Sequence, residues 1–449
     1  MRHTAVFPID DLGFWKKQLL HWVAGHEVGA YLDSNEYSEH GQVVAKSYHL
    51  TTKPGWECLA AADAAEVLEA NAGDAFERLR FLRDGKNNDG KEKNWLFGFL
   101  GYDLKNEVEQ LFSQNFDGIV LPDMGFFRPK SVAVIRGQGL EIQTEERMPE
   151  EVFFEIKSVK PDDYGGIKCQ KVKIELQPRI PKTEYLQIVE AIRQHIIGGD
   201  IYEMNFCQEF FAKGATLHPV AVFERLNGIG KAPFSTFLRW RDRFLLSASP
   251  ERFLKKEGQK LISQPIKGTR RRGRSADEDE KIKQELATSE KDRAENVMIV
   301  DLVRNDLARQ CLPGSVLVDE LCGIYSFATV HQMISTVSGT LPNDAHWLDA
   351  LRDAFPMGSM TGAPKVMAME LIERYERSRR GLYSGAVGYI SPDGDFDFNV
   401  VIRSILCNAA TGYVSVQVGG AIVFDSVPEQ EYEECMVKLE AMLKALGDS

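Results

Sequence analysis

The sequence lacks the features that mark secreted proteins, membrane proteins and zinc ribbons. None of its seven cysteines belongs to a C-x-x-C pair, so the sequence indicates neither a zinc ribbon nor a disulfide framework. Residues 1–10 lack the basic, apolar and small-residue regions of a signal peptide. No apolar run reaches the length of a membrane span. These absences predict a soluble protein of a reducing compartment, the cytoplasm.

Positive charge is also scarce. The 54 lysines and arginines are outnumbered by 66 aspartates and glutamates, which gives a net charge of -12. That balance argues against a general nucleic-acid binder, whose affinity depends on a basic face. The G-x-x-x-x-G-K-[ST] spacing of a Walker A loop is absent, and so is a cysteine in a G-x-C-x-G nucleophile turn. The chain therefore carries no recognisable nucleotide loop or glutaminase of its own.

What is present is length and apolar content. A chain of 449 residues with 43% hydrophobic residues can bury a large core in two or three domains. Helix and strand patterns alternate, which predicts a mixed α/β protein. A charged stretch with glycine and proline places a boundary between a region 1–175 and a region 180–446. Within the first region, Ala61 to Leu82 is rich in alanine and glutamate and predicts a helix, broken near 71–74. In the second region we predict a long helix over 276–310, and strands at 201–211, 235–240, 244–249, 260–266, 383–390, 397–406 and 414–425.

Lys267 is the first candidate for chemistry. It lies in Q-P-I-K-G-T-R-R-R-G-R, between Pro265 and Gly268, where we expect a tight turn followed by four arginines. Nearby cations destabilise an ammonium, so this lysine is expected to be partly deprotonated and nucleophilic near neutral pH. The alternative is a solvated basic loop. Glu251, in the turn S-P-E-R-F, is either an acid/base group or a surface residue.

Two pairs of carboxylates are the second candidate. Asp292 and Glu295 are three residues apart and lie on one face of a predicted helix, and Glu431 and Glu434 repeat that spacing near the C-terminus. Brought together, the pairs would suit a hard divalent cation such as Mg²⁺, which prefers oxygen ligands. The alternative is ordinary surface charge on the helices of an acidic protein.

Three further stretches favour binding of an anion. The loop F-P-M-G-S-M-T-G-A-P-K leads into a helix with Pro364 at its first turn, where free backbone N–H groups attract carboxylate or phosphate. Arg403 lies in an apolar predicted strand, and such a cation usually has a fixed anionic partner. The small residues Gly419, Gly420 and Ala421 expose the backbone N–H groups of a third strand.

Taken together, these stretches resemble the chorismate-utilising enzymes over about Thr183 to Leu446. The resemblance implies an α/β fold of the α+β type, with two large, mainly antiparallel sheets packed face to face and helices outside. It implies that Glu295 and Glu434 hold Mg²⁺, with Asp292 and Glu431 in support. The residues it implies for binding chorismate are Ser359, Tyr389, Arg403, Gly419, Gly420, Ala421 and Lys438.

The lysine of P-I-K-G-T separates branches of this family. The aminodeoxychorismate branch carries lysine at the position of Lys267, whereas the anthranilate branch typically carries alanine. The resemblance therefore implies that Lys267 adds to C2 of chorismate while Glu251 protonates the departing 4-hydroxyl, after which ammonia adds at C4. It also implies a separate glutamine amidotransferase subunit that delivers ammonia, and a place in para-aminobenzoate and folate biosynthesis.

The sequence departs from the family pattern at three positions. Ala421 replaces the usual glycine, and Asp292 stands where the anthranilate branch usually has glutamate. Gln332, in V-H-Q-M, occupies a position where many relatives have histidine; here the histidine is His331. Two other functions compete with C4 amination of chorismate. One is an anthranilate synthase component or a bifunctional relative, and the other is a non-catalytic binding module.

Overall fold

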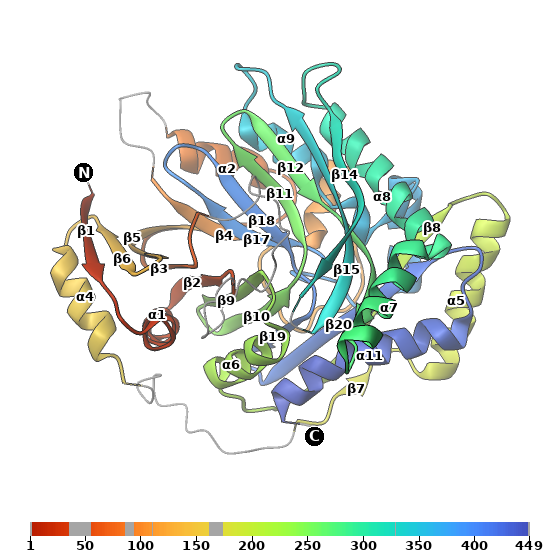
Figure 1. Ribbon diagram of the computed structural model, residues 1–449, viewed down its shortest axis with the longest axis horizontal. Coiled ribbons are helices and arrows are strands. Elements are labelled where there is room, and N and C mark those ends of the chain that lie inside the picture. The colour runs from red at the N-terminus through yellow and green to blue at the C-terminus, as the bar shows by residue number, and fades with distance from the viewer. Residues whose placement is uncertain are drawn as a thin grey trace.

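Twenty strands form the centre of the computed structural model, and every pairing between them is antiparallel in the part of the chain described (Figure 1). The structure describes residues 2–35, 55–85, 94–109, 111–160, 174–327 and 329–447. The strands join into one network that divides at the long strand β5 (Met124–Arg136). Residues 131–136 of β5 pair with β6, and residues 124–127 pair with β4. The network therefore has two arms.

The first arm begins with N-terminal strands and ends at β8. Its order is β1 (His3–Pro8), β6 (Gly139–Thr144), β5, β3 (Cys58–Ala70), β2 (Val28–Asp33), β9 (Phe234–Trp240), β10 (Arg243–Ser249), β19 (Ser404–Asn408), β20 (Tyr413–Ile422) and β8 (Glu203–Ala212). Two short strands pair with opposite ends of β8, namely β7 (Gln177–Pro178) and β16 (Gly362–Ala363).

The second arm leaves β5 through β4 and ends at a three-way junction. Its order is β4 (Leu96–Leu100), β17 (Ala386–Ile390), β18 (Phe396–Val400), β11 (Arg252–Glu257), β12 (Lys260–Gln264) and β15 (Val330–Thr340). Strand β15 pairs with β12 and then with β13 (Ile266–Arg271), and also with β14 (Leu317–Ser326). The chain segment that carries Lys267 thus belongs to a sheet.

The two arms enclose a shared apolar core. Phe99 of β4 meets Trp240 of β9 edge to face with ring centroids 5.1 Å apart, and Phe127 of β5 contacts the same indole. Phe398 of β18 belongs to the same cluster of buried side chains. Burial of large aromatic groups from both arms stabilises their face-to-face packing. The predicted architecture of two antiparallel sheets with helices outside is confirmed.

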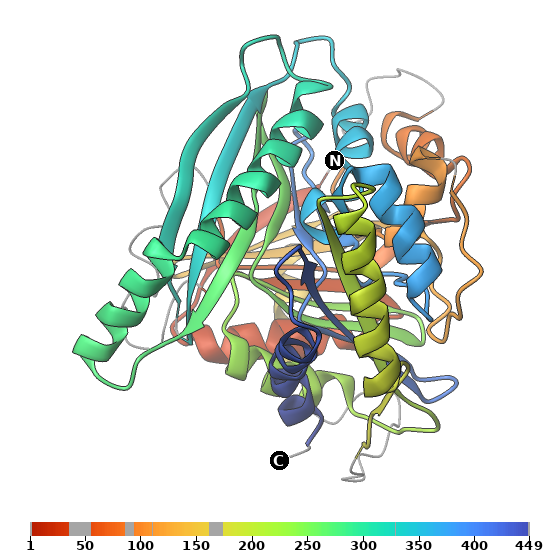
Figure 2. The same cartoon turned by 90° about the vertical axis from the view of Figure 1, so that its right-hand side faces the viewer.

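Helices cover the outer faces (Figures 1 and 2). A second apolar cluster, separate from the core between the arms, lies between the first arm and the helices that cover it. These helices are α1 (Leu12–Gly25), α4 (Pro149–Ser158), α5 (Lys182–Ile197), α6 (Pro219–Gly230), α10 (Lys365–Tyr375) and α11 (Pro428–Leu446). The others are α2 (Ala75–Asp84), α3 (Lys105–Val108), α7 (Ala276–Thr288), α8 (Glu290–Ala308), α9 (Trp347–Ala354) and the 3₁₀ turns η1 (Tyr102–Leu104) and η2 (Gly358–Met360). Figure 2 shows α7 and α8 running beside β14 and β15. Among the helices described, none has the length and apolar content to cross a membrane.

The predicted helix over Ala61 to Leu82 is wrong in its first half. Residues up to Ala70 form β3, and only Ala75 to Asp84 are helical. The side chains of Leu59 and Ala61 enter one apolar cluster while Ala60 and Ala62 enter the other, so the first part of β3, residues 58–62, is buried on both faces. Pairing with β2 and β5 on its two edges satisfies its backbone. Tertiary burial therefore overrides the helix propensity of alanine.

Two other predicted elements are interrupted. The helix over 276–310 is broken at Ser289, which has an extended backbone and whose hydroxyl accepts a hydrogen bond from the Asp292 N–H. The strand over 397–406 ends at Val400 and resumes at Ser404. The division into regions 1–175 and 180–446 stays a prediction. Strands of the two regions pair directly, β2 with β9 and β4 with β17.

Candidate active site

A cavity of about 860 Å³ collects the predicted site residues, Tyr389 excepted, from both arms and from α8 and α11. That volume lies in the range of small-molecule sites. Its lining includes, among others, Glu251, Lys267, Asp292, Glu295, Ser359, Arg403, Gly419, Gly420, Ala421, Glu431, Glu434 and Lys438. Predicted site residues as far apart in the sequence as Glu251 and Lys438 therefore face one space. This convergence argues against the alternative that the two carboxylate pairs are ordinary surface charge.

A bulge in β13 sets the position of Lys267. Ile266 pairs with Ile334 of β15 and Thr269 with Gln332, so three steps on β13 match two on its partner. Gly268 takes up the extra residue with a φ of 84°, a conformation that favours glycine. A Cβ there would lie 2.9 Å from a carboxylate oxygen of Asp292. The bare glycine thus allows α8 to approach, and it explains the glycine after the lysine.

The ammonium of Lys267 is held by a carboxylate. Its Nζ donates a hydrogen bond of 2.8 Å to Oε1 of Glu203, the first residue of β8, and the lysine side chain is only 10% exposed. Burial disfavours the charged lysine, but the charges of Glu203, Glu295 and Glu251 outweigh burial and raise its pKa above the usual value. Lys267 therefore rests as an ammonium.

The prediction that the neighbouring arginines lower the pKa of Lys267 is wrong. Arg270 pairs with Asp292 at 2.6 Å, Arg271 with Glu440 at 2.7 Å, and Arg272 with Asp279 at 2.6 Å. Their charges are engaged by α7, α8 and α11, and none of them is among the causes that act on the pKa of Lys267. The prediction treated sequence neighbours as spatial neighbours. Because β13 is a strand, its side chains point away from one another on alternate faces.

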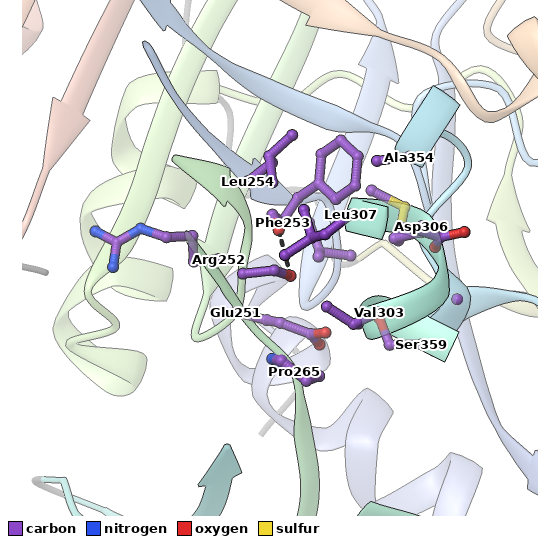
Figure 3. Close-up of a pocket in the computed structure, with 14 residues that line it drawn as sticks. Glu251, Arg252, Phe253, Leu254, Pro265, Val303, Asp306, Leu307, Ala354 and Ser359 are labelled. Carbon is purple, nitrogen blue, oxygen red and sulfur yellow. Dashed lines mark hydrogen bonds between the residues drawn. The ribbon is translucent and has the colours of Figure 1, made fainter. Parts of the chain in front are cut away.

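Glu251 lies between the main cavity and a small apolar one. The small cavity has a volume of about 20 Å³ and is lined by Phe253, Leu254, Val303 and Leu307, among others. Figure 3 shows the carboxyl of Glu251 directed toward Ser359, while Arg252 points away. Burial raises the pKa of Glu251 to about 7, against a hydrogen bond with Ser359 and the charge of Lys267, which both lower it. Such a carboxyl can donate a proton near neutral pH.

The four candidate metal ligands come from two helices. Asp292 and Glu295 lie in the first turns of α8, and Glu431 and Glu434 in those of α11. A Cβ atom added to Gly420 would lie 3.3 Å from an oxygen of Glu431 and 3.7 Å from an oxygen of Glu434, so these two carboxylates converge beside that glycine. Burial, the largest cause, raises the pKa of Glu295 to about 7. The Lys438 ammonium, 2.6 Å from Glu434, lowers the pKa of that carboxyl.

The donor set fits a hard cation. All four side chains offer carboxylate oxygens, the ligand type that Mg²⁺ prefers, and Mg²⁺ commonly takes one or two carboxylates and keeps several waters. No group of three or more metal-ligating side chains is pre-assembled among the described residues. The ammonium of Lys438 lies 2.6 Å from Glu434 and 2.7 Å from the Gly419 carbonyl, so these oxygens already bind a positive charge. Glu295 and Glu434 would be the ligands.

Arg403 is placed for an external anion. It does not lie inside a strand, as predicted, but in the turn between β18 and β19, with a φ of 53°. Its guanidinium lines the cavity and makes no hydrogen bond or ion pair with any residue that the structure describes. Burial lowers its pKa, partly offset by Tyr383 and Glu434. A guanidinium that is half-buried and unpaired suits a substrate carboxylate.

The structure places Tyr389 away from the cavity, contrary to expectation. Its hydroxyl accepts a hydrogen bond of 3.2 Å from the Trp56 indole, and its ring packs against Trp95 and Phe97, outside the cavity lining. Tyr383, six residues earlier, lines the cavity. Tyr383 lies three residues before the start of β17, whereas Tyr389 lies near the far end of that strand. The tyrosine that faces the cavity is therefore Tyr383.

Residues 45–444 match the sequence profile of a family described as chorismate binding enzyme. The chain belongs to the chorismate binding enzyme family. Anthranilate synthase component 1 of Thermus thermophilus is 36% identical over 357 residues, covering 78% of this chain and 76% of the relative. Aminodeoxychorismate synthase component 1 of Salmonella typhimurium is 38% identical over 363 residues, with the same shares covered. The crystal structure of anthranilate synthase component I from Streptococcus pneumoniae matches with a TM-score of 0.75 and 25% identity, covering 92% of this chain and 98% of that one. The predicted family is confirmed.

In this chorismate binding enzyme, Gln332 and His331 face opposite ways on β15. Gln332 is 4% exposed and lines the cavity, and its Oε1 has no hydrogen-bond partner among the described residues. His331 lies outside the cavity, where its two ring nitrogens contact Ser326 at 2.8 Å and Asp279 at 2.9 Å. His331 therefore does not face the cavity, and Gln332 is the residue of this pair that can contact a bound ligand.

Sequence reasoning missed Glu203 and Tyr383. Glu203 is 1% exposed in β8, and its contact with Lys267 bridges 64 positions. Strand β8 also carries Asn205, Gln208 and Glu209, so Glu203 does not stand out in the sequence as a lone charge among apolar residues. The fold brings it to Lys267.

Proposed function

We propose that the protein is aminodeoxychorismate synthase component I, which converts chorismate and ammonia into 4-amino-4-deoxychorismate in para-aminobenzoate and folate biosynthesis. The observation that carries the proposal is Lys267, a buried amine-bearing side chain in the same cavity as Glu251. A relative that bears this name, from Salmonella typhimurium, is 38% identical. A lysine here supplies a nucleophile, and Glu251 supplies a proton donor suited to neutral pH.

The residues divide the reaction between them. Lys267 adds to C2 of chorismate, and Glu251 gives its proton to the departing 4-hydroxyl. Arg403 and the edge of β20 at Gly419 to Ala421 hold the enolpyruvyl carboxylate, with Ser359 and Lys438 beside them. Glu295 and Glu434 would hold Mg²⁺, with Asp292 and Glu431 in support, and the ion would supply a positive charge that offsets the ring carboxylate and helps to orient it. Ammonia then adds at C4 and expels Lys267.

The ammonia comes from a separate glutamine amidotransferase subunit in this proposal. None of the cysteines lies in a G-x-C-x-G turn, and the Salmonella typhimurium relative is named as a component 1. The isolated chain is expected to use ammonium salts at alkaline pH and to leave glutamine untouched. Glutamine-dependent product from the rigorously purified chain would contradict the two-subunit proposal.

Anthranilate synthase component I is the second candidate, because the Thermus thermophilus relative of that name is 36% identical. Product analysis by mass spectrometry, with chorismate, Mg²⁺ and an ammonium salt, separates the two. 4-Amino-4-deoxychorismate supports the proposal and anthranilate supports the alternative. A chain that binds chorismate without converting it would be a binding module.

Variants of Lys267 test the covalent step. Lys267→Ala should retain chorismate binding and lose the 4-amino product, with residual chemistry moving to C2. Lys267→Arg should fail too, because an arginine does not deprotonate to attack. Wild type incubated with chorismate but no ammonia should carry an adduct on the peptide containing Lys267.

The matched control is Lys365→Ala. Lys365 is also buried and paired, with Asp306 at 2.8 Å, but it lies outside the cavity lining. That variant should keep the identity of the product while losing stability. If wild type forms no adduct and Lys267→Arg makes the 4-amino product at a near wild-type rate, Lys267 only pairs with a substrate carboxylate.

A further inference from the structure

Glu203 lies behind Lys267 and not in the cavity. It is the first residue of β8, it is 1% exposed, and it does not belong to the cavity lining. Its Oε1 is 2.8 Å from the Lys267 Nζ. Its backbone is fixed on one side by β16, where Ala363 pairs with it, and the next residue of β8 pairs with β20. The carboxylate is thus held against the ammonium that must lose a proton before Lys267 can attack.

The second oxygen of this carboxylate is unused. Oε2 of Glu203 is buried and has no hydrogen-bond partner within the described ranges. A buried polar atom without a partner is costly and calls for an explanation. Glu209, on the same face of β8, offers the contrast: it accepts hydrogen bonds from Arg179, Tyr413 and Ser415. Glu203 can therefore take up a proton without losing a bond to any group other than Lys267.

We propose that Glu203 accepts the proton of the Lys267 ammonium and so converts this lysine into a nucleophile. The inference rests on the proposed function, since it needs Lys267 to attack chorismate. Glu203 touches no substrate atom and is a positioning residue that acts through Lys267. The amine is then released by a proton shift inside a buried pair, without loss of a proton to water.

The proton balance closes over one turnover. At rest Lys267 is an ammonium, Glu203 a carboxylate and Glu251 a carboxylic acid. The proton of Lys267 moves to Glu203, the free amine forms a bond to C2, and the C4–O bond breaks as Glu251 protonates the leaving hydroxyl to give water. Ammonia then forms a bond to C4 and the C2–N bond breaks. Lys267 regains its proton from Glu203, and Glu251 takes one from the new C4 ammonium.

The pH dependence of adduct formation separates this route from loss of the proton to solvent. The charged groups that face Lys267 are Glu203 from β8, Glu251 from the turn before β11, Glu295 from α8 and Glu434 from α11. With saturating Mg²⁺ and chorismate and no ammonia, wild type should form the adduct at a rate that is flat from about pH 5 to about pH 6. Nearer pH 7 and above, the rate should fall as Glu251 ionises. Loss of the proton to solvent would instead give a rate that rises about tenfold per pH unit below pH 7.

Glu203→Gln is the decisive variant, because it keeps the size and a hydrogen-bonding oxygen but cannot accept the proton. Its adduct rate at pH 6 should fall by about 10²- to 10⁴-fold and should rise with pH up to 7, unlike wild type. Glu203→Asp keeps a carboxylate and should recover the flat profile at a reduced rate. The matched control is Glu209→Gln, which alters an equally buried glutamate of β8 paired with Arg179 and should keep the wild-type profile.

The outcomes distinguish this inference from the proposed function. No adduct in wild type would remove the covalent role of Lys267 and with it both claims. An adduct in wild type, together with a Glu203→Gln variant of the same rate and the same pH profile, would overturn the role of Glu203 alone. Should Glu203→Gln not fold, the wild-type profile still decides, because a rate rising with pH below 7 contradicts internal transfer.

Discussion

Replacing Glu251 with glutamine should stabilise the protein at high pH. The side chain is 5% exposed, and burial raises its pKa from 4.5 to about 7. Between these values the carboxyl ionises in the unfolded chain but stays protonated in the folded one. The free energy of unfolding of wild type therefore falls as pH rises from about 4.5 to about 7. Glutamine has the same shape and no charge, so the variant escapes that loss.

The expected size follows from the displaced pKa. Moving a pKa from 4.5 to about 7 corresponds to about 3 kcal/mol, at about 1.4 kcal/mol per pH unit. At pH 4 the carboxyl is largely protonated in both states, and the pKa effect contributes little to the difference between variant and wild type. By pH 8 the variant should have gained roughly 3 kcal/mol relative to its value at pH 4. The gain is largest where the carboxylate would otherwise be charged in an apolar setting.

Urea unfolding followed by tryptophan fluorescence at several pH values measures this difference. Glu155→Gln is the control of opposite sign, because hydrogen bonds from His26, Arg147 and Trp22 lower the pKa of Glu155 to about 2. That variant should lose stability, relative to wild type, as pH rises above about 2. An advantage of Glu251→Gln that stays the same from pH 4 to pH 8 would refute the raised pKa. It would also remove the basis for Glu251 as a proton donor at neutral pH.

Three further predictions concern the rest of the cavity. Glu434→Gln should abolish turnover, measured by steady-state kinetics, without unfolding the chain, measured by circular dichroism. A near-normal rate with normal Mg²⁺ dependence would exclude Glu434 as a metal ligand. Gln332→His should leave the rate within roughly tenfold, because Gln332 acts by hydrogen bonding; a gain of roughly a thousandfold would mark the natural residue as a defective proton donor. Arg403→Lys should raise KM for chorismate at least about tenfold, since a lysine cannot form the bidentate contact; unchanged KM would place the carboxylate elsewhere.

Local patterns predicted those parts of the site that depend on local geometry. The spacing of Asp292 and Glu295 and of Glu431 and Glu434 put each pair on one helical face, and the structure confirms both helices. Neither pattern predicts that the two helices meet at one cavity. The family resemblance supplied that expectation. Tyr389 was placed at the site by the family resemblance, whereas the packing of β17 turns its ring to Trp95 and Phe97 and leaves Tyr383 at the cavity.

The helix prediction for the alanine-rich segment of β3 failed for a different reason. Helix propensity describes a few residues in isolation, whereas β3 is stabilised as a strand by two apolar clusters and by pairing with distant segments on both edges. Small side chains suit a strand covered on both faces. In a sequence they are equally typical of a helix, so the pattern alone does not separate the two.

Lys267 shows how burial changes an electrostatic argument. The arginines that follow it predicted a lowered pKa, yet each of the first three is paired with an acid on a helix, and the groups that act on Lys267 are carboxylates from other elements. An ammonium beside Glu203 is stable at rest and unreactive, which looks unfavourable for a nucleophile. The same contact, however, provides an acceptor 2.8 Å away in a site shielded from water. Because the pair as a whole keeps its net charge when the proton moves within it, the amine can form without a change in the net charge of the buried pair.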